Sequence, residues 1–247
     1  MKKRLLLFVA AILLASCQIT ERVYIQESGA VKYETELDFS EMMGLMFSQA
    51  DKDSLRQIGE FPIDSVMKFS DLEKLEGKFG DDETSDAERE FMKALDKMNV
   101  RMVMNDNEGK MIFGIQEKNI KTFNASMKEI SEAGDKLAAE DKKSAENLSQ
   151  TGLLKSIEFK YDGKSFQRIG GNQTGILEEM EDSTAESTRQ MMGMLAYKLE
   201  YHFPKKIKKS SVENATYSLD GKTMTIETSM MELFENPDKY NFTVEFE

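Results

Sequence analysis

Two residue types that commonly carry catalysis each occur once in the 247-residue chain, as Cys17 and His202. A cysteine or serine nucleophile needs a base beside it, most often a histidine. His202 lies on the polar side of an alternating stretch, so we interpret it as a surface residue. No serine lies in a Gly-x-Ser-x-Gly elbow. We therefore expect no catalytic residue and no enzyme activity.

The residues that bind metals or cofactors are also sparse. A zinc site needs clustered cysteines and histidines, which this chain does not contain. Methionines do cluster, at 42, 43 and 46 and at 191, 192 and 194, and thioethers favour Cu(I). Because each cluster lies beside leucine or phenylalanine at helical spacing, we interpret these methionines as core residues. The glycine-rich segment 170–175 lacks the Lys-Ser/Thr ending of a phosphate loop. We predict no metal site and no cofactor.

Cys17 follows a distinctive N-terminal segment. Residues 2–4 are basic and residues 5–14 are all apolar. A bilayer-spanning helix needs roughly 20 apolar residues, so this stretch is instead typical of an export signal. Residues 14–17, Leu-Ala-Ser-Cys, resemble the lipobox of bacterial lipoproteins. The resemblance implies cleavage before Cys17 and attachment of a diacylglycerol to its sulfur. The alternative is an ordinary secretory signal in which a cysteine happens to follow Ser16.

The anchor and the composition limit the partners. Stable anchoring needs at least two acyl chains, which a bacterial lipoprotein carries, so we expect permanent attachment to a membrane. Loss of residues 1–16 removes three positive charges, which changes the net charge from −12 to −15 over 231 residues. This acidity argues against a nucleic-acid partner and disfavours attraction to anionic head groups. No cysteine is left for a disulfide, so stability must come from an ordinary core.

Hydrophobic periodicity predicts the elements that follow. Alternation predicts strands at 31–39, 197–203 and 240–246, and hairpins at 100–115, 157–166 and 212–228. In the second hairpin, an Asp162-Gly163 turn places Phe159 opposite Phe166; in the third, the Asp-Gly turn pairs Tyr217 with Met224. Helical spacing and caps predict helices after Ser40 and at 66–75, 85–98, 120–137, 183–196 and 230–235. Residues 205–209 are predicted to be a basic loop.

Hairpins with helices between them, without a regular βαβ alternation, predict an α+β fold. We expect a mainly antiparallel sheet with helices packed on one face. The predicted organisation is a signal peptide at 1–16, a tether at 17–29 and a single domain at 30–247, with a weak internal boundary near 138–150. Residues 197–247 resemble the C-terminal parts of small uncharacterised envelope lipoproteins of Bacteroidota-type bacteria, a family with no established activity.

Two functions remain open from the sequence. The first is a non-enzymatic envelope lipoprotein that binds or assembles with another envelope protein. The second is a carrier of a lipid or other apolar ligand in a cavity lined by methionine and aromatic residues. Residues 18–21 lack the acidic run of surface-export signals, which favours the periplasmic face of the outer membrane. Ser54, Ser65 and Ser183 each follow an aspartate, as in the O-glycosylation sites of these bacteria.

Overall fold

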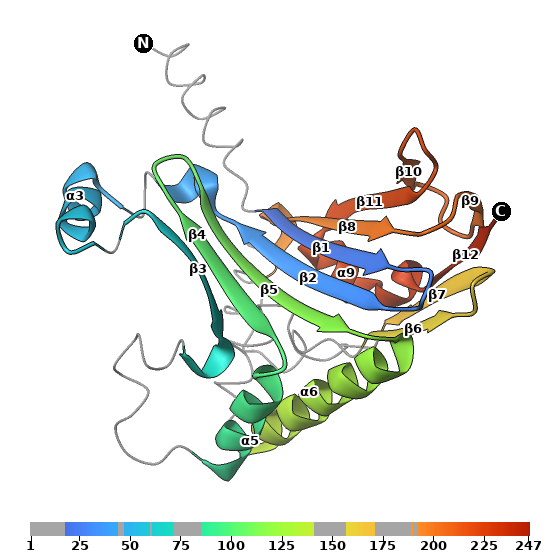
Figure 1. Cartoon of the computed structure of the whole chain (residues 1–247), viewed down its shortest axis with the longest axis horizontal. Helices are drawn as coiled ribbons and strands as arrows, with labels where there is room; N and C mark the ends of the chain where they lie inside the picture. Colours follow the sequence, from blue (N-terminus) through green and yellow to red (C-terminus); the bar gives the residue numbers. More distant parts are fainter. Residues whose placement is uncertain are drawn as a thin grey trace.

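The computed structural model describes residues 18–43, 47–59, 61–71, 85–140, 157–170, 189 and 192–247. They form two sheets (Figure 1). The larger has eight strands in the order β10-β11-β8-β1-β2-β5-β4-β3, and the smaller has four in the order β6-β7-β12-β9. Within them only β1 and β8 pair in parallel. The predicted α+β class with mainly antiparallel pairing is confirmed, whereas the division into two sheets was not predicted.

The strands are β1 (Gln18–Ile25), β2 (Val31–Asp38), β3 (Ile63–Lys68), β4 (Asn99–Met104), β5 (Gly109–Glu117), β6 (Ile157–Tyr161), β7 (Ser165–Gly170), β8 (Ala196–His202), β9 (Ile207–Ser210), β10 (Thr216–Tyr217), β11 (Thr223–Ser229) and β12 (Phe242–Phe246). The helices are η1 (Ser40–Met42), α3 (Gln49–Gln57), α5 (Asp86–Leu95), α6 (Ile120–Glu140), α9 (Met230–Glu235) and η2 (Pro237–Tyr240).

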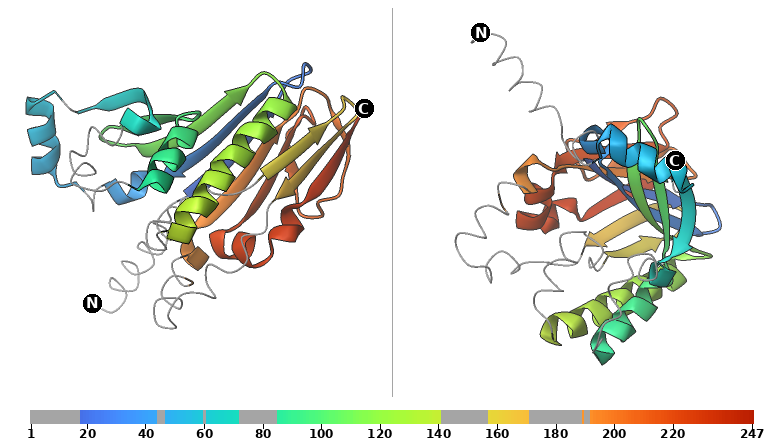
Figure 2. Two further views of the ribbon diagram at one scale, coloured as in Figure 1. Left: turned by 90° about the horizontal axis from the view of Figure 1, so that it is seen from below. Right: turned by 90° about the vertical axis from the view of Figure 1, so that its left-hand side faces the viewer.

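The two long helices cover one face of the larger sheet. Viewed from below, α6 crosses in front of the strands and α5 lies beside it (Figure 2, left). Phe123, Met127 and Ile130 of α6 are buried at the helical spacing expected from the sequence. Ser85 caps α5 as predicted, because its Oγ accepts a hydrogen bond from the backbone N–H of Glu88 at 3.1 Å. We call this covered face the inner face and the opposite one the outer face.

One expectation about the N-terminal part is wrong. Residues 18–25 were expected in a tether, but they form β1, which lies between β2 and β8 near the middle of the larger sheet. Gln18 is paired in register with both Asp38 and Ala196. The pattern was hard to recognise because polar Thr20 and Glu21 are buried alongside the apolar residues of this strand.

Three further predictions differ from the structure. Residues 207–210 form edge strand β9, not a loop, because β12 provides a pairing partner that is remote in sequence. Residues 63–68 form β3, which includes the first three residues of the helix predicted at 66–75, because pairing with β4 overrides local helix preference there; residues 69–71 are helical. In the β6–β7 hairpin Tyr161, and not Phe159, lies opposite Phe166, so the turn is centred one residue later than predicted, between Gly163 and Lys164. The Tyr217–Met224 pair is confirmed.

Candidate functional site

A charged residue lies at the centre of the inner face. In β1, side chains alternate between faces, and Ile19, Val23 and Ile25 point inward together with Glu21. The side chain of Glu21 is 0% exposed. A carboxylate taken out of water is very costly unless it is paired and hydrogen-bonded. The surroundings of Glu21 therefore have to supply these partners.

Three tyrosines from neighbouring strands supply the hydrogen bonds. Tyr201 Oη of β8 donates to Glu21 Oε1 at 2.6 Å. Tyr33 Oη of β2 and Tyr197 Oη of β8 each lie 3.3 Å from Glu21 Oε2. Thr35 Oγ1 in turn donates to Tyr33 Oη at 3.3 Å. Because β2 and β8 flank β1, all of these hydroxyl groups come from the strands on either side of the carboxylate.

The positive partner comes from the smaller sheet. Arg168 of β7 is 3% exposed, and its Nε lies 3.6 Å from Glu21 Oε1. The same Nε donates to Tyr201 Oη at 2.7 Å, so Tyr201 bridges the two charges. A second guanidinium nitrogen, Nη1, donates to the backbone carbonyl of Tyr240 at 3.0 Å. We call Glu21, Arg168 and the three tyrosines the buried cluster.

The buried cluster changes how its members titrate. Burial raises the pKa of Tyr197 and Tyr201 well above the ordinary value, and the negative charge of Glu21 raises both further. Burial and Glu21 also raise the pKa of Tyr33. Burial alone would lower the pKa of Arg168, but Tyr201 and Glu21 outweigh it and the net change is upward. The arginine therefore stays charged and the phenols stay protonated over the whole physiological range.

This arrangement links the two sheets and is closed to solvent. Glu21, Tyr33, Tyr197 and Tyr201 belong to the larger sheet, while Arg168 belongs to the smaller one. Each of the five side chains is at least 95% buried. A buried ion pair is weak evidence for net stability, and in some proteins such pairs instead specify how elements pack. We therefore interpret the buried cluster as a structural link between the sheets.

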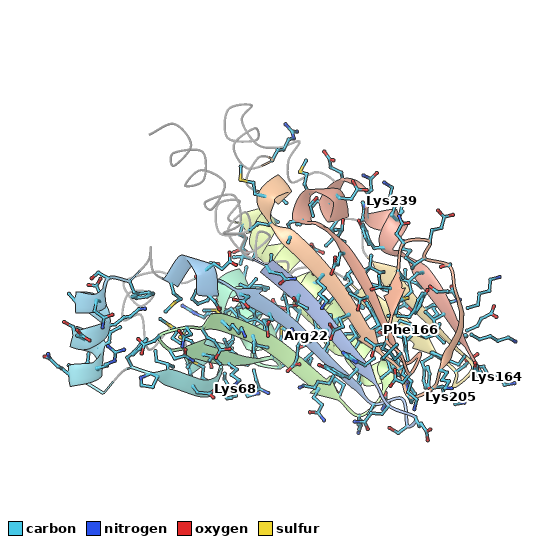
Figure 3. The ribbon with its side chains drawn as sticks, turned by 90° about the horizontal axis from the view of Figure 1, so that it is seen from above. Arg22, Lys68, Lys164, Phe166, Lys205 and Lys239 are labelled. Carbon is cyan, nitrogen blue, oxygen red and sulfur yellow. The ribbon has the colours of Figure 1, made fainter. Side chains whose placement is uncertain are left out.

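The outer face carries the groups that a partner can reach. Seen from above, the strands lie in front of α5 and α6, with Arg22 near the middle (Figure 3). Arg22 makes two hydrogen bonds to Glu36 on the neighbouring strand, at 2.8 and 3.2 Å. His202 stacks on Tyr24 with a 4.4 Å centroid distance, and its Nε2 lies 2.7 Å from Glu200 Oε1. His202 thus lies on the polar face as predicted, held by these neighbours.

A shallow depression of about 200 Å³ lies on this face over β2, β5, β4 and β3. It forms where Gly114 interrupts the row of side chains between Glu34 of β2 and Asn99 of β4. Lys32 and Arg101 lie at its border, and both are paired, with Glu34 and Asp64 respectively. Val66, 65% exposed, adds an apolar surface. The depression therefore combines balanced charges with apolar contact area.

The space between the two sheets is filled by aromatic side chains. Phe166 packs against Phe159, Phe203 and Tyr201 with centroid distances of 5.2 to 5.8 Å, and Phe123 stacks on Phe159 at 4.8 Å. The apolar-ligand carrier was expected to have a cavity lined by such residues. Here these rings pack against one another, so the carrier function stays a prediction that these contacts do not support.

The sequence-predicted site residues lie in different places. Cys17, the expected lipidation site, lies outside the described residues, one position before β1. Of the second methionine cluster, Met192 is buried but Met194 is 72% exposed, although we expected it to face the core. Within the described part of the chain, no three His, Cys, Asp or Glu residues are grouped as a metal site would require. No helix in that part is long and apolar enough to cross a bilayer.

Sequence reasoning missed the buried cluster, although two signals pointed to it. Glu21 has the same parity as Ile19, Val23 and Ile25, so an alternating strand there must bury a carboxylate. The inward positions of β2 and β8 carry tyrosines, and a buried phenol usually has a hydrogen-bond partner. Nothing in the sequence of β7 identified Arg168 as the counterion of Glu21, because the second sheet was not predicted.

Comparison with known proteins gives little further information. No protein-family model matches the chain, and no curated protein matches it. Among solved structures, the folded domain of LppM from Mycobacterium tuberculosis aligns with 94% of this chain and 89% of its own. The TM-score is 0.37 and the sequence identity 7%. At that TM-score the likeness carries no argument about function.

Proposed function

We propose that the chain is a lipid-anchored envelope lipoprotein whose folded domain is a non-enzymatic binding or assembly module. The observation that carries the proposal is the position of β1. β1 begins at Gln18, the residue directly after Cys17 of the lipobox-like motif. Cleavage before Cys17 would therefore remove nothing from the sheet and would leave an acylated residue next to its first strand.

The binding role is supported by the outer face. Its charged side chains are largely paired with each other, so the face does not select strongly for one sign of charge. The depression around Gly114 offers apolar area beside these pairs. Protein–protein interfaces commonly combine such a core with a polar rim. We infer that an envelope protein inserts side chains into this depression, and that the buried cluster holds the two sheets together.

The anchor is tested by replacing the cysteine. Cys17→Ala is expected to release the protein from the membrane fraction and to abolish incorporation of a labelled fatty acid. Cys17→Ser gives a second variant that removes the thioether with little change in size. Continued retention of both variants in the membrane fraction would refute the anchor.

Binding is tested with a photo-crosslinking amino acid at Val66, beside the depression. The matched control places it at Glu227, an exposed outer-face position on β11, roughly 30 Å away by strand spacing. We expect a discrete adduct with an envelope protein from Val66 and not from Glu227. Equal labelling from both positions would contradict the proposed surface, and co-purified lipid in native mass spectrometry would favour the carrier instead.

A further inference from the structure

We propose that the end of the larger sheet where β1 and β8 begin is held directly against the lipid surface, with the exposed Met194 side chain in contact with it. This inference rests on the proposed lipidation of Cys17. It adds the orientation of the domain on the membrane, which the anchor alone does not specify.

The length of chain between the anchor and the fold carries the argument. A flexible tether of about a dozen residues would let the domain move roughly 20 Å from its attachment point. Gln18, however, is already paired with Asp38 on one side and Ala196 on the other. Consecutive Cα atoms are about 3.8 Å apart, so an acylated Cys17 lies immediately next to the sheet. There is no residue between them to act as a spacer.

The same register places an apolar side chain beside the anchor. β8 runs parallel to β1, and Ala196 lies next to Gln18. Met194 precedes Ala196 by two residues, so it lies beyond the end of the sheet on the Cys17 side. From strand spacing and residue rise, we place its Cα within roughly 10 Å of that of Gln18, the residue bonded to Cys17. Its 72% exposure is the highest of any methionine in the described part of the chain.

The neighbouring elements form the rest of this end, which we call the anchor edge: Gln18, 193–196 and 229–231. Ser229 is paired with Ala196, and the backbone N–H of Met230 donates to the carbonyl of Leu195 at 2.9 Å. These residues, on the β8 and β11 side of Gln18, carry no charged side chain, whereas on its β2 side Gln18 pairs with Asp38, which faces Lys110. α9 begins at this border, because it directly follows Ser229, and α3 projects beyond the same end of the sheet on its β3 side (Figure 1). The uncharged β8 and β11 side of this end can approach a lipid surface without stripping water from ions.

The opposite end of the sheet provides an internal control. The turn between β10 and β11 lies beyond the His202 end of β8, because Thr223, the first residue of β11, pairs with His202. The seven residues of β8 separate the two ends by about 20 Å at 3.3 Å per residue. Leu219 in that turn is fully exposed, so it is an exposed apolar residue like Met194. It therefore reports on the end that faces away from the membrane.

The test uses the full acylated protein in phosphatidylethanolamine–phosphatidylglycerol vesicles. The chain has one cysteine, Cys17, and in the acylated protein its sulfur is bound in the thioether. Met194→Cys and Leu219→Cys therefore each add a single reactive thiol. Each is labelled with a fluorophore, and the vesicles contain a lipid that carries a quencher. Gly193→Cys is a second reporter, since an added Cβ there meets nothing within 4 Å.

Quenching is expected to be several-fold stronger from 193 and 194 than from 219. Insertion of ten Gly/Ser residues between Cys17 and Gln18 adds a reach of roughly 17 Å and should lower the signal at 194 to that at 219. Equal quenching at 194 and 219 in a protein that is acylated and vesicle-bound would overturn the orientation and leave the proposed function intact. Absence of the acyl group, read from the mass of the N-terminal peptide, would overturn both.

Discussion

Glu21 and Arg168 face each other between the two sheets, with Arg168 Nε 3.6 Å from Glu21 Oε1 and Tyr201 Oη bonded to both. These two residues are 147 positions apart in sequence, yet they form a buried ion pair in a chain that carries most of its charge on the surface. The pair joins the smaller sheet to the larger one through polar contacts. The aromatic residues around it provide the apolar burial.

Glu21→Gln is expected to destabilise the fold strongly, because it leaves the Arg168 charge buried without its counterion. Breaking one partner of a buried pair typically costs about 3–5 kcal/mol. The double variant Glu21→Gln/Arg168→Met should recover part of this loss, because no charge is left buried. The measurement is urea denaturation of the Cys17→Ser chain without its signal peptide. Asp64→Asn, which breaks the exposed pair with Arg101, is the control and should have little effect.

A loss of stability in alkaline solution follows from the three buried phenols. The pKa of Tyr33, Tyr197 and Tyr201 is raised in the folded protein, whereas in the unfolded chain it returns to about 10. Their contribution to the free energy of unfolding is therefore complete below pH 10. It declines as the pH rises above 10, because only the unfolded chain releases the phenol protons. Each phenol adds a slope of about 1.4 kcal/mol per pH unit. Denaturant titrations from pH 9 to 11 should show this decline, and a flat profile would contradict it.

Asn124→Ala is expected to loosen the contact between α6 and edge strand β6. The side-chain amide of Asn124 donates to the carbonyl of Phe159 at 2.8 Å and accepts from its N–H at 3.0 Å. Both bonds satisfy backbone groups on a strand edge, and loss of such partners costs about 1–3 kcal/mol. Hydrogen exchange of the Phe159 amide should accelerate along with the loss of stability. Asn107→Ala, in the exposed β4–β5 turn, should change stability by no more than about 0.5 kcal/mol.

Local patterns predicted much of this fold. The elements with strong periodicity or caps, such as α6 and the β10–β11 hairpin, form where the sequence indicated. The predictions failed for strands whose pairing partners are remote in sequence. β1 pairs with β8 across more than 170 residues, and β9 becomes a strand only against β12. Single-strand alternation carries no information about such partners, which is why the second sheet was missed.

The site was less predictable than the fold. Lipidation of Cys17 is the one function that the sequence motif indicates, and it stays a prediction. The buried cluster required Glu21 to be recognised in a strand, but its polar neighbours Thr20 and Arg22 made the segment resemble a tether. The outer-face depression depends on the absence of a side chain at Gly114 between two specific strands. Register is therefore needed before the depression can be inferred.

Gly109→Ala is expected to displace η1 and the small satellite core beneath it. An added Cβ at Gly109 would lie 2.5 Å from Met43 Sδ and from the Phe39 ring. Met43 belongs to a buried group with Phe61 and Met104, so it has little room to move. Overpacking of this kind typically costs about 1–3 kcal/mol. The matched control is Gly193→Ala, where an added Cβ meets nothing within 4 Å. Urea denaturation of both variants measures the difference, and equal stability would show that Met43 and Phe39 can move aside.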